Sequence, residues 1–521
     1  MIYMGIERKK KAAFDDEAVI IEREKIQFKK MTQTAMPKLI IGLGIPTMLS
    51  MMVTSLYNLA DTYFVSLIGD DSITAAASNL LGLMSIIQAI GFTFGMGSGN
   101  IVSRLLGKRD REGADRTATT ALLMALVSGM LILTFGLIFM EPILKLFGSI
   151  DPEVLAHSKD YALFIIIAAP FMCMSFVLNN VLRAEGKALL SMIGLIVGAV
   201  VNIALDPLLI FVADLEIMGA AIATCTSQIL SFLILLFMFL SGKTIVRFRP
   251  RLISRRFSVY WQIIVTGFPS FCRQILASLC TIFLTRAAYT YGIKAYGVGG
   301  DKAAQAAFGV VQKVFMLAFS ISLGIGQGYQ PVLGYNYSAK RFDRVKSAYL
   351  FTLAFSTGLM TTFAILCAIF SPQLMKMFSL SASATEIGTL TLRLQCIAMP
   401  LLPLNFMAGL TYQCVGNKLI ATALSVSRQG LFYIPAVLVL PLFMDLLGVQ
   451  SCQAVADVCA FLFALPFTFL FFNTLKKEQK KADEEAKLTA TQEESDQDET
   501  RDEEVLKEIS QFLAENMNAN E

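Results

Sequence analysis

The stretch Val201-Asn-Ile-Ala-Leu-Asp-Pro207 lies inside a long apolar run and places Asn202 and Asp206 four residues apart. Residues at positions i and i+4 share one face of a helix. An ionisable side chain at membrane depth is costly, and it therefore indicates a functional site. Pro207 removes a backbone donor and favours a kink beside the carboxylate. The run 188–212 thus predicts a membrane-spanning helix that carries a functional acid.

The composition of the whole chain fits a membrane protein. Its 521 residues are 55% hydrophobic and only 16% charged, whereas soluble domains carry roughly 25% charged residues. One histidine, His157, and nine cysteines without a Cys-x-x-Cys pair predict neither a metal site of the usual kind nor a disulfide framework. We expect no cofactor other than a coupling ion and no nucleic-acid partner.

Apolar runs long enough to span a bilayer, which takes roughly 20 residues, follow one another along the chain. We predict an all-α membrane protein with twelve transmembrane helices near 38–66, 73–102, 117–140, 161–182, 188–212, 217–241, 258–290, 303–328, 347–370, 387–413, 419–443 and 449–474.

Lysine and arginine alternate between the connections. The predicted inside loops hold clusters, such as Arg104 to Arg116 and Lys243 to Arg256, and the predicted outside loops hold only single lysines: Lys145, Lys159, Lys294, Lys302 and Lys376. Because positive charge favours the cytoplasmic side, we predict a multi-pass protein of the cell membrane with both termini in the cytoplasm.

The two halves of the chain look like a repeat. Gly44 and Pro46 recur in order as Gly267 and Pro269, and further glycines and prolines follow at similar offsets. Six spans per half give a parallel repeat with its axis along the membrane normal. We predict a cytoplasmic tail (1–36) with a short amphipathic helix at the membrane surface, an N-lobe (37–241) and a linker (242–256). A C-lobe (257–475) and an acidic, largely disordered cytoplasmic tail (476–521) follow.

A second acid, Asp61, lies at a depth similar to that of Asp206. Two partly desolvated carboxylates cannot both stay ionised cheaply, and one proton or Na⁺ relieves their repulsion. Side-chain oxygens suit such a hard cation. The sequence leaves open whether the first span contacts the fifth and sixth, and the alternative is that each acid is a structural helix-end residue. The candidate cation ligands are Asp61, Asn202, Asp206 and Thr224, with Asn58 and Gln228 as additional polar ligands.

The membrane-depth charges of the second half are mostly basic. Arg273, Lys313 and Arg428 lie in or near spans, and Asp457 is the clearest acid there. They either pair with Asp457 or backbone carbonyls, or line a cavity that favours anionic cargo. With Gln274, these basic residues are the candidate substrate-cavity residues.

Several motifs resemble those of the multidrug and toxic compound extrusion (MATE) transporters over most of residues 38–475. The motifs are Tyr57-Asn-Leu-Ala-Asp61-Thr, Gly97-Ser-Gly99, Arg183-Ala-Glu-Gly-Lys187, Asn202-x-x-x-Asp206-Pro207, Gln327-Gly-Tyr-Gln-Pro331 with Gly334-Tyr-Asn336, and Arg428-Gln429 with Ile434-Pro435.

The resemblance implies two six-helix lobes in a V, alternating access, and export driven by Na⁺ or H⁺. It also implies a cation site in the N-lobe at Asp61, Asn202, Asp206 and Thr224. Some members use acids in helices 7 and 10, but this chain has none at mid-helix there, and Glu386 lies only at an outer edge. The glycines Gly95, Gly97 and Gly99 are expected to give places to bend.

We therefore expect a non-enzymatic, monomeric antiporter that exports drugs or other organic solutes. The nearest alternative is a flippase for lipid-linked oligosaccharide or another anionic amphiphile, which the basic residues of the second half would suit. A major facilitator carrier shares the two parallel halves, but its loop motif is not matched. An intramembrane enzyme would need a nucleophile with a base, or a metal constellation, and the single histidine argues against both.

Overall fold

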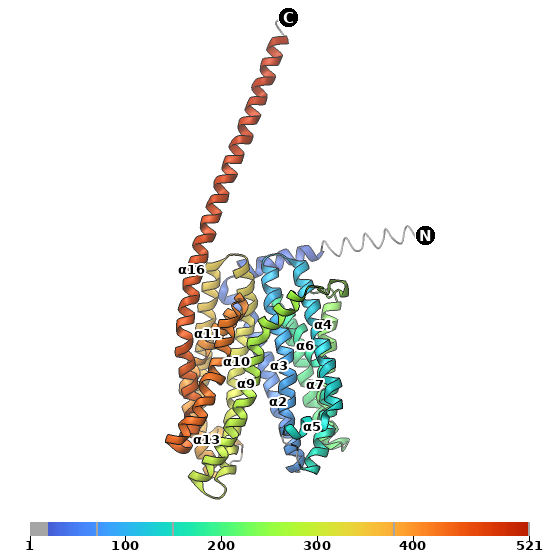
Figure 1. Ribbon diagram of the computed structural model, residues 1–521, viewed down its shortest axis with the longest axis vertical. Helices are drawn as coiled ribbons and strands as arrows, with labels where there is room; N and C mark the ends of the chain where they lie inside the picture. Colours follow the sequence, from blue (N-terminus) through green and yellow to red (C-terminus); the bar gives the residue numbers. More distant parts are fainter. Residues whose placement is uncertain (1–18, 69–70, 148, 150, 379–380, 519–521) are drawn as a thin grey trace, which may run out of the picture.

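The structure is a computed structural model that describes residues 19–68, 71–147, 149, 151–378 and 381–518. Every regular element in these ranges is a helix, which confirms the all-α class. The basic start of the chain, residues 1–18, lies outside the described residues. Long apolar helices run side by side through the body of the molecule (Figure 1).

The N-lobe contains six long helices and one short one. They are α2 (Met36–Ser66), α3 (Asp71–Gly107), α4 (Arg111–Ile138), the short α5 (Met140–Leu146), α6 (Pro152–Ala184), α7 (Ala188–Pro207) with its π-helical continuation η1 (Leu208–Val212), and α8 (Glu216–Leu240).

The C-lobe repeats this order. It contains α9 (Phe257–Tyr296), α10 (Gly300–Ser338), α11 (Phe342–Ile369), the short α12 (Ser371–Met377), α13 (Ala382–Ala398), η3 (Met399–Leu401), α14 (Leu402–Val415), α15 (Lys418–Val426), the π-helix η4 (Ser427–Tyr433) and α16 (Ile434–Asn518).

The described residues contain 11 continuous segments long and apolar enough to cross a membrane. The last of them, Lys418–Glu485, includes a break at Asp445, whose φ of 49° is not helical. Gly448 packs there against the backbone of Leu440, so the chain turns back sharply. This segment holds two crossings, and the predicted twelve spans are all present.

The repeated glycines lie where the two lobes meet. A Cβ atom on Gly97 would clash with the carbonyl oxygen of Ile263, and one on Gly324 would clash with the backbone of Met48. The first pair joins α3 to α9, and the second joins α10 to α2. Helix α3 runs on as a single helix past Gly97, where the missing side chain allows close packing on α9. Bending at these glycines stays a prediction.

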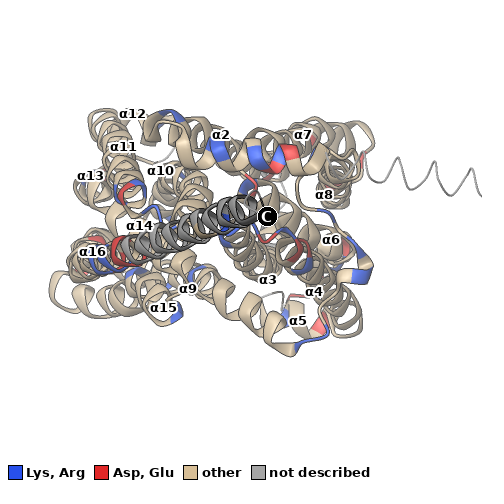
Figure 2. Ribbon diagram, turned by 90° about the horizontal axis from the view of Figure 1, so that it is seen from above, with Lys and Arg blue, Asp and Glu red and all other residues tan. Residues whose placement is uncertain are grey.

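Both termini lie on one face of the molecule, which we call the termini face (Figure 1). From this face the lobes diverge toward the opposite end, as the arms of a V. Seen from the termini face, lysines and arginines are scattered over its loops (Figure 2). The linker between the lobes packs on the N-lobe, because Glu185 accepts the backbone N–H groups of Ile245 and Val246 at 2.9 Å each.

A helix over residues 19–33 runs across the termini face and contacts both lobes (Figure 1). On the N-lobe side, Gln27 donates a hydrogen bond to the carbonyl of Glu185 at 2.8 Å. On the C-lobe side, Asn336 donates to the carbonyl of Met31 at 3.0 Å, and Arg344 donates to the carbonyl of Thr34 at 2.5 Å. We call this segment, residues 19–34, the N-terminal strap.

The acidic tail is helical, contrary to the prediction of disorder. Helix α16 continues without interruption from the last span to Asn518 and projects from the termini face (Figure 1). Residues 476–518 contain neither glycine nor proline, and they are rich in Glu, Lys, Gln and Ala, which favour helix. The preceding span supplies the first turns, so the unfavourable nucleation step is already complete.

Candidate cation site

Three helices of the N-lobe bring the predicted site residues together. Asp61 comes from α2, Asn202 and Asp206 from α7, and Thr224 from α8. Asn202 Nδ2 lies 3.3 Å from Asp206 Oδ1 and 3.4 Å from Thr224 Oγ1. Helix α2 packs against both α7 and α8, so the first span does contact the fifth and sixth, which the sequence left open.

A tyrosine that sequence reasoning missed joins Asp61 to this group. Tyr161 on α6 donates a weak hydrogen bond from its hydroxyl to Asp61 Oδ2 at 3.4 Å, and it also lies within hydrogen-bonding reach of Thr224. Tyrosines are frequent in membrane helices, and nothing in its local sequence marks Tyr161 as part of a site.

The site is buried and rich in oxygen atoms without hydrogen-bond partners. Asp206 is 0% exposed and Asn202 is 1% exposed. Within the described part of the chain, no hydrogen-bond partner exists for Asp61 Oδ1, Asn202 Oδ1 or Asp206 Oδ2. The two carboxylates lie close enough for their charges to interact. Oxygen ligands and net negative charge fit a hard monovalent cation or a proton.

The predicted kink beside Asp206 takes the form of a π-helical turn. Helix α7 ends at Pro207, and residues Leu208–Val212 follow as the π-helix η1. Proline lacks the N–H group that an α-helical turn needs, and π-helical turns occur frequently at functional sites. The widened turn lies directly after the buried carboxylate.

The two additional polar candidates lie at the edge of this group. Gln228 is within 3.5 Å of the hydroxyl of Tyr57, four residues before Asp61 on the same face of α2. Among the described residues, no side-chain hydrogen bond joins Asn58 to either carboxylate, and Asn58 is half-buried. Tyr57 begins the motif that ends at Asp61-Thr, and its spacing of four residues from Asp61 could have identified it as a residue near the site.

The basic residues of the C-lobe are held by an acid and by aromatic rings. Arg428 Nε donates to Asp457 Oδ1 at 2.7 Å, which is the pairing that the sequence offered as one of two interpretations. The guanidinium of Arg428 lies 5.0 Å from the ring centre of Phe315, and that of Arg273 lies 5.4 Å from the ring centre of Phe406. Such contacts are favourable cation–π interactions.

The remaining substrate-cavity candidates are spread over two helices. Gln274 on α9 lies 3.4 Å from Gln88 on α3, across the lobe interface. Lys313 on α10 is exposed. The structure therefore brings Arg273 and Arg428 to neighbouring aromatic rings but does not join all four candidates in one cluster.

Two six-helix lobes of parallel topology, with a buried pair of acids at membrane depth, define the class of secondary membrane transporters. The sequence profile of the MatE family matches residues 46–208 and 269–439, one segment in each lobe. The chain belongs to this family, the multidrug and toxic compound extrusion transporters.

Similar proteins cover nearly the whole chain. The multidrug export protein MepA of Staphylococcus saprophyticus is 25% identical over 434 residues, which are 83% of this chain and 93% of that protein. MepA of Staphylococcus aureus strain N315 is 25% identical over 440 residues, covering 84% and 94%.

Solved structures agree with the fold. A multidrug resistance MATE family transporter in an outward-facing conformation superposes with a TM-score of 0.80 at 25% identity, covering 86% of this chain and 98% of that one. A MATE protein in complex with MaL6 gives a TM-score of 0.80 at 25% identity, covering 86% and 99%. The V-shaped two-lobe fold predicted from the sequence is confirmed.

Proposed function

We propose that this protein is an antiporter of the cell membrane that exports drugs or other organic solutes in exchange for Na⁺ or H⁺. The observation that carries the proposal is the buried N-lobe site, where Asp61, Asn202 and Asp206 each offer an oxygen atom without a hydrogen-bond partner among the described residues. The staphylococcal relatives are named multidrug export proteins, which supports an organic cargo.

The mechanism that we propose is alternating access, coupled through α2. A cation at Asp61 and Asp206 relieves the repulsion between the carboxylates. Asp61 lies on the same helix as Ser55, whose hydroxyl is 2.6 Å from that of Ser320 on α10 of the other lobe. A change in the packing of α2 on cation binding therefore acts directly on a contact between the lobes.

The topology supports a location and an orientation. Lysine and arginine residues on the termini face (Figure 2) fit the positive-inside rule if both termini are cytoplasmic. The lobes then diverge toward the outside. Each lobe supplies half of the interface between them, so we propose that one chain forms a complete carrier and works as a monomer in the bilayer.

The flippase alternative is not favoured. It needs basic side chains free to bind an anionic headgroup, but the charge of Arg428 is matched by Asp457 at 2.7 Å. Arg273 and Arg428 also lie against aromatic rings. A groove open to lipid and lined by unpaired cations would favour the flippase instead.

The decisive experiment measures efflux of a fluorescent organic cation from cells or vesicles under separate Na⁺ and H⁺ gradients. Wild type is compared with Asp61→Asn and Asp206→Asn. A matched control is Asp160→Asn, because Asp160 is exposed and lies next to Tyr161 on α6.

We expect both site variants to be expressed and to lose gradient-driven efflux, while the control exports as wild type does. The gradient that drives wild type identifies the coupling ion. Normal efflux by both site variants would mean that the acids are structural and would contradict the proposed coupling site.

A further inference from the structure

Arg183 is a buried cation without a carboxylate partner among the described residues. It lies in the last turn of α6 and is 5% exposed. Its Nε donates to Ser191 Oγ at 3.2 Å and its Nη2 donates to Asn179 Oδ1, whereas its Nη1 has no hydrogen-bond partner. A buried charge needs a counter-charge to be tolerated, and Arg428 shows how this protein supplies one elsewhere.

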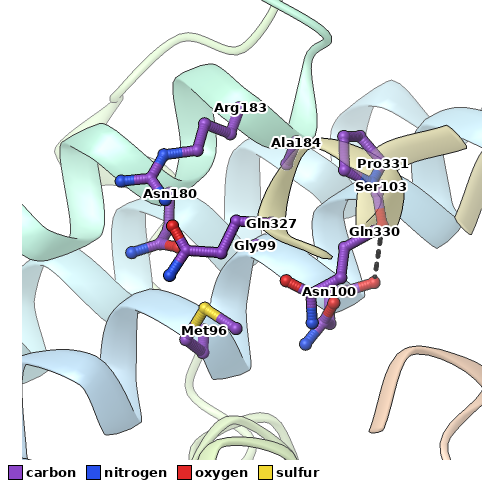
Figure 3. A pocket seen from close by; sticks show the side chains of 10 residues that line it. All are labelled: Met96, Gly99, Asn100, Ser103, Asn180, Arg183, Ala184, Gln327, Gln330 and Pro331. Atoms are coloured by element: carbon purple, nitrogen blue, oxygen red, sulfur yellow. Dashed lines mark hydrogen bonds between the residues drawn. The ribbon is translucent and has the colours of Figure 1, made fainter. Parts of the chain in front are cut away.

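Arg183 lines a cavity of about 10 Å³ between the two lobes (Figure 3). Asn100 of α3 and both Gln327 and Gln330 of α10 line the same cavity. Each of these amide side chains is at most 6% exposed, and each has a side-chain nitrogen without a partner in the described part of the molecule. The functions assigned to the N-lobe site use none of these four residues.

The chemistry of this cavity favours an anion. Guanidinium groups only donate hydrogen bonds, and amides donate through their nitrogen atoms. One unpartnered acceptor, Gln327 Oε1, is also present, but rotation of that amide exchanges its oxygen and nitrogen positions. The positive charge of Arg183 does not depend on such a rotation, so the net charge around the cavity is positive.

We propose that the cavity binds a chloride ion, held by Arg183, Asn100, Gln327 and Gln330. A cavity of about 10 Å³ has room for about one water-sized particle, which favours a small monatomic anion over a carboxylate or phosphate group. Chloride is monatomic, accepts hydrogen bonds from all sides and supplies the missing negative charge.

The placement of the ligands links chloride to the packing of the lobes. Asn100 and Arg183 belong to the N-lobe, and Gln327 and Gln330 belong to the C-lobe. The complete site therefore exists only while the lobes are packed together at the termini face. A ligand that binds one conformation stabilises that conformation. The effect on transport rests on the proposed alternating access, but the binding site itself does not.

The test is a thermal unfolding measurement on the purified full chain, in sodium chloride and in sodium gluconate at equal ionic strength. The single tryptophan, Trp261, provides the fluorescence signal. We expect chloride to raise the unfolding midpoint saturably by a few degrees relative to gluconate, and bromide to act in the same way. Equal midpoints in chloride and gluconate would overturn the proposal and assign water to the cavity.

Three variants locate the effect. Arg183→Gln is expected to lose the chloride dependence, and the matched control Arg116→Gln, an exposed arginine of the same face, to retain it. Gln327→Glu brings its own negative charge, so we expect it to be stable in gluconate and insensitive to chloride. If Arg183→Gln does not fold, the chloride dependence of the unfolding midpoint of Gln327→Glu still tests the proposal. A variant Gln327→Glu that keeps the full chloride response would place the ion elsewhere and overturn the proposal.

Discussion

Asp206 lies just before the π-helix η1 of the N-lobe and Arg428 lies within the π-helix η4 of the C-lobe, yet they carry opposite charges. Arg428 is neutralised by Asp457, which also accepts a hydrogen bond from Gln453 at 2.9 Å. The charge of Asp206 interacts with that of another acid, Asp61. The charges of the C-lobe pair therefore cancel each other. In our proposal, a bound cation balances the two carboxylates of the N-lobe pair.

The C-lobe ion pair makes a prediction about stability. We expect Arg428→Met to lower the free energy of unfolding by about 3–5 kcal/mol, because it leaves the carboxylate of Asp457 buried and unpaired. The double variant Arg428→Met/Asp457→Leu should recover most of this loss. Thermal unfolding of the two proteins is the measurement. A single variant as stable as wild type would show that Asp457 has another partner.

Thr224 distinguishes the two possible coupling ions, because a hydroxyl oxygen can ligate Na⁺ but does not hold the transported proton. Under a Na⁺ gradient, we expect Thr224→Val to raise the Na⁺ concentration for half-maximal efflux about tenfold, which is the effect of losing roughly 1.4 kcal/mol of binding. Thr224→Ser keeps the hydroxyl and is the control. Under an H⁺ gradient both variants should behave as wild type does. If Thr224→Val leaves the Na⁺ dependence unchanged, the hydroxyl is not a ligand.

At the scale of helices, the lobe interface depends on glycines that permit backbones to touch. Helices α2 and α10 approach one another at Gly324, and α3 and α9 approach at Gly97. Interfaces of this kind between membrane helices are stabilised by packing and not by the hydrophobic effect, since lipid is as apolar as the side chains. A single added side chain therefore acts on the whole contact.

We expect Gly324→Val to separate α10 from α2 and to reduce efflux at least tenfold, while Gly309→Val on the same helix has little effect. A Cβ on Gly309 would meet nothing within 4 Å. The opening of the interface is measured by alkylation of the buried Cys414 of the C-lobe, which lies within hydrogen-bonding reach of Ser103 on α3 of the N-lobe. Labelling of Cys414 in Gly324→Val that is as slow as in wild type would contradict this role of the glycine.

The helices themselves could be predicted from the sequence, because their long apolar runs have no other stable form in a membrane. The contact of α2 with α7 and α8 could not, since spacing along the chain carries no information about which spans are neighbours. For the same reason, the sequence did not show that Tyr161 lies beside Asp61. The prediction of a disordered tail was wrong. The charged composition of the tail is typical of disorder, but its helix continues from the preceding span.

At the scale of the whole molecule, the N-terminal strap adds a further contact between the lobes on the termini face. It is held by Gln27 on one lobe and by Asn336 and Arg344 on the other. If the lobes separate at this face during transport, the strap has to release one of them. Its hydrogen bonds therefore favour the conformation described above.

Deletion of residues 1–34 should make the termini face open more often. We expect Cys414 to be alkylated several-fold faster in the deletion variant, with the labelling of Cys173, which is buried inside the N-lobe, unchanged. Peptide-resolved mass spectrometry measures both rates in one sample. Equal acceleration at both cysteines would indicate general destabilisation and would argue against a specific role of the strap.

Because α16 runs unbroken from the last span to Asn518, the tail moves with the C-lobe as one lever. The segment 476–518 is roughly 65 Å long at about 1.5 Å per residue. A rotation of the lobe by roughly 10° would displace the far end of such a helix by about 11 Å. Small rearrangements within the bilayer are thereby amplified into a large displacement at a distance from the membrane, where a dye on the tail could report each transport cycle.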